Sequence, residues 1–345
     1  MSNYKYSHPG LALVLLFISI TTSSSVLALG ECGMSCCIGG TTTSGVTLAQ
    51  NFGLSVQYER MNMRTIRNGS DAISPNDVID LFWASGSNYV VPTDMTMEKL
   101  SFVAAKPINE RWQVLGILPM VRNNMDMRRK MPNGMVMNMQ MEEISGIGDV
   151  TLMGLYTAYT DAPVRATKRL TLGFGVKTPT GENDARNPMG NFVHAMMQAG
   201  TGSWDPIIMA SYMRAWYPIM TQINLLYHYP TESDRGYQFG DQLNLDLIAR
   251  YQVDNYTNIG LALNVIYAGK DKDHDGLYSR PAMSMIDNPA YTGLTSYFIT
   301  PSFQYKIPNS GGNIELKYQA PIYQDVNGYQ QVTDSRWMAT VSWAF

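Results

Sequence analysis

The final ten residues of the chain, 336–345, alternate between apolar side chains and polar or small ones. One set of alternate positions is apolar and mostly aromatic: Trp337, Ala339, Val341, Trp343 and Phe345. The other set is polar or small apart from one methionine: Arg336, Met338, Thr340, Ser342 and Ala344. Because successive side chains of a β-strand point to opposite faces, this pattern predicts a strand with two unlike faces.

The same alternation recurs along most of the chain. We predict further strands at 49–63, 95–106, 111–122, 148–160, 169–178, 203–215, 222–229, 243–251, 259–267, 294–307 and 314–322. Long polar breaks follow the first, third, fifth and ninth strands, and tight turns follow the second, fourth, sixth, eighth and tenth. Outer-membrane barrels have long external loops and short periplasmic turns, a regularity that a soluble sandwich does not need. We therefore predict an all-β fold, a transmembrane antiparallel up-and-down β-barrel of about twelve strands.

Composition agrees with a membrane barrel and excludes some other classes. Charged residues make up 15% of the chain, below the share of about 25% that is typical of soluble proteins. Aromatic residues reach 11%, yet the mean hydropathy is only -0.15. Such values suit strands with one lipid-facing side. The formal net charge is -3, whereas proteins that bind nucleic acid usually carry a basic surface. We therefore expect no nucleic-acid partner.

The N-terminal residues 1–30 have the features of a cleaved signal peptide. Lys5 is a positive residue before an apolar core at 11–20, and small residues around Ala28 and Gly30 suit cleavage. We expect a periplasmic cysteine-containing segment and linker at 31–47 and the barrel at 48–345. An even number of strands then places both termini in the periplasm, and the protein in the outer membrane of a Gram-negative bacterium.

Three cysteines and a methionine lie at the start of the mature chain: Cys32, Met34, Cys36 and Cys37. Thiols at this density in an exported protein are usually oxidised or bound to metal. Cys32 could pair with Cys36 or Cys37 in a disulfide. Alternatively, the thiolates and the Met34 thioether could form a soft site for Cu(I). The sequence leaves both alternatives open.

Methionine is unusually frequent, with 24 residues, and several crowd one loop: Met125, Met127, Met131, Met135, Met137, Met139 and Met141. On an extended chain, the four at 135, 137, 139 and 141 share one face. Thioethers are soft ligands that suit Cu(I), so the loop is a candidate copper port. The alternative is an adaptable apolar surface, since methionine fills irregular spaces.

The sequence predicts neither a required cofactor nor catalysis. Asp271, Asp273 and Asp275 precede Gly276 in the pattern that begins a Ca²⁺ loop, but Ala282 stands where the last ligand is expected. A weak Ca²⁺ site or a solvated acidic loop fits this segment. His194 and His228 lack the neighbouring serine of a barrel lipase, and no catalytic triad is evident. We therefore expect that the protein is not an enzyme.

Polar residues on the faces opposite the apolar ones are candidates for the barrel lumen. The charged members of this set are Lys177, Asp246, Arg250, Glu315, Lys317 and Arg336. Both signs of charge are present. Such a lining would tune which solutes pass through the barrel.

Three stretches carry a family resemblance: Gly146 to Leu152, Leu170 to Gly181, and Gly200 to Asp205. Together they resemble the outer-membrane transporter family named for the meta-pathway of phenol degradation. The resemblance implies a barrel in outer-membrane lipid that passes small hydrophobic or aromatic solutes. The last strand, ending on Phe345, is similar to the C-terminal signal that the barrel assembly machinery recognises. We therefore expect a small-solute channel, with a copper-handling barrel that uses the methionine loop and the cysteine cluster as the alternative.

Overall fold

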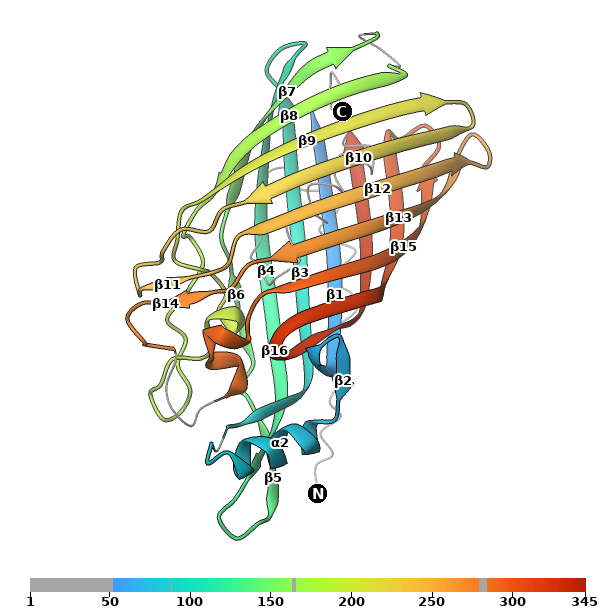
Figure 1. The fold of residues 1–345 in the computed structure, drawn as a ribbon. Helices are drawn as coiled ribbons and strands as arrows, with labels where there is room; N and C mark the ends of the chain where they lie inside the picture. Colours follow the sequence, from blue (N-terminus) through green and yellow to red (C-terminus); the bar gives the residue numbers. More distant parts are fainter. Residues whose placement is uncertain (1–51, 88, 163–165, 279–283) are drawn as a thin grey trace, which may run out of the picture.

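A computed structural model describes residues 52–345 except 88, 163–165 and 279–283 (Figure 1). Antiparallel strands form a ring in which each wall strand pairs with the next. The wall consists of β1 (Gly53–Gly69), β3 (Val91–Pro107), β4 (Trp112–Lys130), β7 (Thr151–Thr160), β8 (Lys168–Lys177), β9 (Asp205–Trp216), β10 (Ile219–His228), β12 (Gln242–Gln252), β13 (Thr257–Ala268), β15 (Leu294–Lys306) and β16 (Gly312–Ala344). The last strand pairs with the first, which closes the barrel.

The long strand β16 crosses the wall twice. Its first part pairs with β15 from Asn313 to Val326, and its last part pairs with β1 from Tyr329 to Ala344. Between these parts Gly328 has a φ of 66°, a conformation that glycine adopts without strain. The other ten wall strands cross once, so the barrel has twelve crossings, as the sequence predicted.

The two ends of the barrel differ in structure (Figure 1). One end, here called the turn end, carries short connections such as 108–111, 217–218 and 253–256. The opposite end, the loop end, carries the remaining elements: β2 (Asp71–Ile73), α2 (Pro75–Ala84), β5 (Val136–Gln140), β6 (Ile144–Ile147), η2 (Ala195–Met197), β11 (Tyr237–Gln238), β14 (Lys272–Asp273), η3 (Met285–Asp287) and η4 (Pro289–Tyr291). None of the helices in the described part of the chain is long and apolar enough to span a membrane.

The alternation of side chains becomes an outer apolar face and an inner polar face. On β12, for example, Leu247 and Tyr251 are exposed on the outside, whereas Asn244, Asp246 and Arg250 are buried inside the barrel. An apolar outer surface is what lipid requires of a membrane barrel.

On β1, β3 and β4 this alternation inverts toward the loop end. The outer face of β1 is apolar at Leu54 and Tyr58 but carries Arg60 and Arg64 beyond them. The inner face of β1 changes from polar to apolar along the same direction, because Met61 and Met63 are buried there. These strands thus extend past the apolar band as a sheet whose apolar face points inward. The first and third predicted strands end at residues 63 and 122, whereas β1 and β4 continue to Gly69 and Lys130.

Helix α2 lies in a segment that the sequence analysis treated as a polar break. Ser74 caps the helix, since its side chain accepts a hydrogen bond from the Asp77 backbone N–H at 3.2 Å. Pro75 occupies the first turn, where its missing N–H costs nothing. The apolar face of the helix, Val78, Ile79 and Phe82, is buried against the inner methionines of β1, β3 and β4. The helix therefore covers the apolar face of the extended sheet.

Candidate functional site

All six charged residues predicted for the lumen lie on the inner face. Three of them form one group: Arg250 pairs with Glu315, and the Lys317 Nζ lies 3.0 Å from Glu315 Oε2. Arg250 also donates a hydrogen bond to Gln304 at 3.3 Å. Glu315 is fully buried, so two cations compensate one carboxylate. The role of these residues in selectivity stays a prediction.

Arg336 belongs to a second inner group whose other members the sequence analysis missed. Its Nε lies 3.1 Å from Glu59 Oε1, and the other Glu59 oxygen lies 3.0 Å from the Lys99 Nζ. Glu59 follows Ser55 and Gln57 at alternate positions of β1, and this spacing could have identified it as an inner residue.

Asp246 lies on the inner face of β12 and contacts the amide of Asn264. Its Oδ1 accepts a hydrogen bond from Asn264 at 2.8 Å. The Asn264 side-chain oxygen in turn accepts hydrogen bonds from Thr300 at 2.6 Å and from Gln319 at 3.0 Å. The inner face of β12, β13, β15 and β16 is therefore a continuous hydrogen-bonding surface, here called the polar wall.

The opposite side of the barrel has an apolar inner surface, here called the apolar wall. Its buried members come from β3, β4, β7, β9 and β10: Val103, Ala105, Leu115, Ile117, Met153, Leu155, Ile207, Met209 and Leu226. They occupy the same alternate positions as polar inner residues such as Gln113 and Thr151. This wall was not predicted from the sequence, because every apolar set of alternate positions was expected to face lipid.

A cavity of about 1230 Å³ opens at the turn end. It reaches from the connection at Trp216 and Pro218 to Gln304 and Arg250 of the polar wall. The cavity therefore connects the charged inner group with that end of the barrel.

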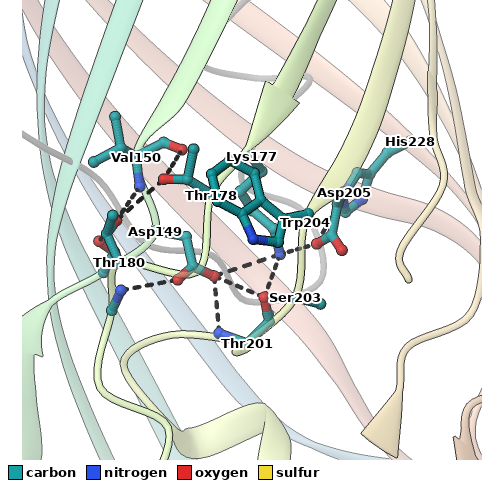
Figure 2. A network of polar contacts seen from close by, with 12 residues as sticks. Asp149, Val150, Lys177, Thr178, Thr180, Thr201, Ser203, Trp204, Asp205 and His228 are labelled. Carbon is teal, nitrogen blue, oxygen red and sulfur yellow. Dashed lines mark hydrogen bonds and ion pairs between the residues drawn. The ribbon is translucent and has the colours of Figure 1, made fainter. Parts of the chain in front are cut away.

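Lys177 is at the centre of a buried network near the loop end (Figure 2). Its ammonium group pairs with Asp205, lies 3.5 Å from Asp149 Oδ2 and donates a hydrogen bond to Thr201 at 2.8 Å. His228 approaches the same Asp205 oxygen at 3.4 Å. Lys177, Asp149 and Asp205 are all buried, so the ammonium group and the two carboxylates stabilise one another where water does not reach them.

Asp149 joins the three stretches that carry the family resemblance. One carboxylate oxygen accepts a hydrogen bond from the Gly181 N–H at 3.0 Å, and the other accepts one from the Thr201 N–H at 2.8 Å. In addition, the Val150 N–H donates to Thr180 at 2.8 Å. The network therefore holds both ends of the loop between β8 and β9 against the start of β7.

Glycines allow the two ends of this loop to approach each other and the start of β7. A Cβ on Gly200 would lie 2.5 Å from the Gly181 carbonyl carbon, and a Cβ on Gly181 would lie 2.7 Å from the Gly148 Cα. Since both neighbours are backbone atoms, no side-chain rotation could relieve the contact. The sequence showed these glycines, but only the topology shows that they meet.

The candidate metal ligands are divided among different places. Cys32, Met34, Cys36 and Cys37 lie outside the described residues. Met125 is buried in an inner apolar cluster, against which Met127 and Met141 pack. Met135 and Met137 are exposed on the hairpin of β4 and β5, and Met139 is half-buried opposite Met127. The hairpin face thus passes from a buried base to an exposed tip, and copper binding stays a prediction.

The candidate Ca²⁺ loop folds against its neighbours. Asp271 accepts hydrogen bonds from the Tyr237 hydroxyl at 2.7 Å and the Gly240 N–H at 2.8 Å. Asp273 accepts one from the Tyr278 N–H at 3.0 Å. Within the described ranges, no three His, Cys, Asp or Glu side chains form a group that could hold a metal ion. Ca²⁺ binding is an expectation from sequence alone.

Two loop-end carboxyl groups have raised pKa values. Burial raises the pKa of Asp287 to about 7, and the nearby Asp273 carboxylate acts in the same direction. Burial also raises the pKa of Asp271 to about 6, although the Tyr237 hydroxyl opposes the shift. Burial lowers the pKa of His194 to about 4. The loop end therefore contains groups that titrate near neutral pH.

Comparisons with known proteins agree with this architecture. The sequence profile described as "Putative MetA-pathway of phenol degradation" matches residues 79–337. No curated protein sequence matches the chain. The solved COG4313 outer membrane channel from Pseudomonas putida F1 is similar with a TM-score of 0.53 and 11% identity, over 86% of this chain and 96% of that chain. A Pseudomonas aeruginosa FadL homologue gives a TM-score of 0.43 at 8% identity, over 86% and 90%. The profile confirms the predicted resemblance, and the first of these structures confirms an outer-membrane barrel fold.

Proposed function

We propose that this chain, which belongs to the family described as the MetA pathway of phenol degradation, is an outer-membrane channel for small aromatic solutes that carry a polar group. The observation that carries the proposal is the two-sided inner surface, with the apolar wall on one side and the polar wall on the other. The phenol-degradation family and the similar outer membrane channel of Pseudomonas putida F1 support the same interpretation.

The two walls match the two parts of such a solute. The aromatic ring of such a solute gains free energy when it leaves water to pack among Leu155, Ile207 and Met209, which are buried inside the barrel. A hydroxyl or carboxylate needs hydrogen-bond partners at the same time, because an unpaired polar group is costly to bury. The amides and hydroxyls around Asn264 supply such partners. A fully polar solute would lack a favourable contact on the apolar side.

The test compares benzenesulfonate with methanesulfonate, two permanently charged anions that cross protein-free bilayers very slowly and differ in the aromatic ring. Vesicles that contain the barrel should take up benzenesulfonate faster than protein-free vesicles and should favour benzenesulfonate over methanesulfonate. Met209→Gln places an amide on the apolar wall and should reduce that preference severalfold. The matched control Met135→Gln, at the exposed hairpin tip, should keep it. Equal preference in the parent and Met209→Gln would reject the two-wall mechanism. Uptake no faster than in protein-free vesicles would reject the channel.

We also propose that the loop end faces outward and that both termini lie in the periplasm. The short connections at the turn end and the long ones at the loop end support this orientation. A protease site inserted at Asn133 should be cut on intact cells, whereas one at Asp254 should be cut only after the outer membrane is permeabilised. The reverse result would place the loop end in the periplasm.

Outer-membrane lipid and the barrel assembly machinery are the proposed partners. The C-terminal strand closes the ring, and the Phe345 N–H donates a hydrogen bond to the Phe52 carbonyl at 2.9 Å. Deletion of Phe345 should slow assembly in cells more than refolding into vesicles in vitro, since only the cell contains the machinery. An equal effect in both would remove this partner from the proposal.

A further inference from the structure

A row of methionines crosses three neighbouring wall strands near the loop end. Met63 on β1 is in register with Met95 on β3, and Met95 is in register with Met125 on β4. These strands lie side by side in Figure 1. Directly opposed residues of antiparallel strands share one face, with Cβ atoms about 5 Å apart. The three side chains are therefore adjacent on the inner face, and they are here called the methionine row.

The row is buried and extended by methionines from other elements. Met63, Met95 and Met125 are at most 3% exposed. The Met141 N–H donates a hydrogen bond to the Met125 carbonyl at 2.8 Å, which places Met141 beside the end of the row. Met197 and Met285, from two loops, belong to the same buried cluster. Methionine side chains from the wall and from the loops that cover it thus belong to one buried cluster.

A buried oxygen without a hydrogen-bond donor lies next to the row. Asn123 precedes Met125 by two positions on the inner face of β4 and is in register with Met97. Its amide nitrogen donates to the Met197 carbonyl at 3.2 Å. Its side-chain oxygen accepts no hydrogen bond from the described residues and is removed from solvent. An unsatisfied buried oxygen is costly, and a bound cation would satisfy it.

Neighbouring charged and hydrogen-bonding groups decide which methionine sulfurs could bind a cation. Met61 is engaged, because its sulfur accepts hydrogen bonds from Thr333 at 3.1 Å and Arg336 at 3.2 Å. The Arg336 guanidinium would also repel a cation at that position. The methionine row lies farther toward the loop end, where the surrounding cluster is apolar. A neutral thioether site in such surroundings favours a soft monovalent ion over a hard divalent one.

We propose that Met63, Met95 and Met125, with the Asn123 side-chain oxygen, form a binding site for a soft monovalent cation, Cu(I) or Ag(I). The site is separate from the two-wall solute path and does not depend on the proposed channel activity. Met135 and Met137, at the exposed tip of the hairpin, are not ligands of this site.

Ag(I) is the probe, because it is soft, monovalent and stable in air. The full-length barrel is purified in detergent with Cys32, Cys36 and Cys37 replaced by serine, which removes thiolate binding. Calorimetric titration should show saturable Ag(I) binding. Replacement of Met63, Met95 and Met125 by leucine should abolish it, because leucine keeps the apolar volume but provides no ligand.

A matched control carries three Met→Leu replacements at exposed positions, Met135, Met137 and Met189, and should bind Ag(I) like the parent. Heat-modifiable migration on gels reports folding of each variant. If the triple row variant fails to fold, the single Met95→Leu and Met125→Leu variants must each weaken binding. Asn123→Asp should strengthen it, since a carboxylate attracts the cation. Parent-like Ag(I) affinity in the folded row variants, or an X-ray absorption spectrum of the parent without sulfur neighbours, would overturn the proposal.

Discussion

Lys177 on β8 and Asp205 on β9 are register partners, and their side chains form an ion pair in which neither side chain is more than 2% exposed. The same ammonium group also approaches Asp149, so one cation compensates two buried carboxylates. Removal of a partner from a buried pair leaves an uncompensated charge, which costs far more than loss of an exposed pair. Lys177 therefore links β7, β8 and β9 at this end of the barrel through buried charges.

Lys177→Met should destabilise the folded barrel by about 3–5 kcal/mol, because Asp149 and Asp205 would lose their shared cation. Denaturant unfolding in lipid vesicles measures the change. Lys317→Met is the matched control: Glu315 keeps its pairing with Arg250, so the loss should be much smaller. Equal losses in the two variants would contradict the central role of Lys177.

Gly200→Ala should cost about 1–3 kcal/mol, because the new methyl group would meet the Gly181 backbone at 2.5 Å. The expected result is a lower unfolding midpoint and faster proteolysis of the loop at 182–200. Gly116→Ala serves as the control, since its Cβ would meet only a Leu152 side-chain carbon at 3.7 Å. A stability change no larger than that of the control would mean that the two ends of this loop can move apart freely.

The alternation of apolar and polar residues predicted the wall strands well, because lipid requires apolar side chains on the outer face. The segments predicted at 169–178 and 294–307 correspond to β8 and β15 to within one residue at each end. The alternation did not predict the parts of β1 and β4 that extend beyond the apolar band. Beyond Tyr58 the outer positions become charged at Arg60 and Arg64, so an apolar-outside rule ends the strand too early.

The missed parts of the candidate site depend on contacts between residues distant in sequence. The sequence contained the signals for α2, a Ser74 cap followed by Pro75, but they lay within a stretch rich in turn residues. Asp149, Gly181 and Thr201 could be recognised as family positions, whereas their hydrogen bonds follow only from the strand order. The apolar wall could not be predicted either, since the sequence does not distinguish an apolar side chain inside a barrel from one on its outer face.

Leu261→Arg tests the assignment of the two faces. Leu261 is 50% exposed on the outer face of β13, and an arginine near the middle of a lipid bilayer should cost about 2–4 kcal/mol. Gln252→Arg, which points into the cavity at the turn end, should cost much less because water reaches that space. Unfolding in vesicles compares the two variants. An equal cost would contradict the assignment of lipid and lumen.

The stability of the loop end should decrease as pH rises from about 4 to about 7. Burial raises the pKa of Asp287 to about 7, whereas an unfolded aspartate has a pKa of about 3.9. Between these values the folded loop binds the proton that the unfolded loop has released. The stabilisation is therefore complete below the lower pKa and lost as pH rises through the upper one. Asp271, with a pKa of about 6, should add to the effect in the same direction.

Hydrogen exchange of the segment 284–292, corrected for the intrinsic effect of pH, measures this dependence. Exchange should be slower at pH 5 than at pH 8 in the parent protein. Asp287→Asn should reduce the difference, because the amide can still accept the Ser284 N–H hydrogen bond but carries no charge at any pH. Asp254→Asn, at an exposed turn with a lowered pKa, is the control and should leave the difference unchanged. If Asp287→Asn retains the full pH dependence, another group at the loop end must be responsible for it.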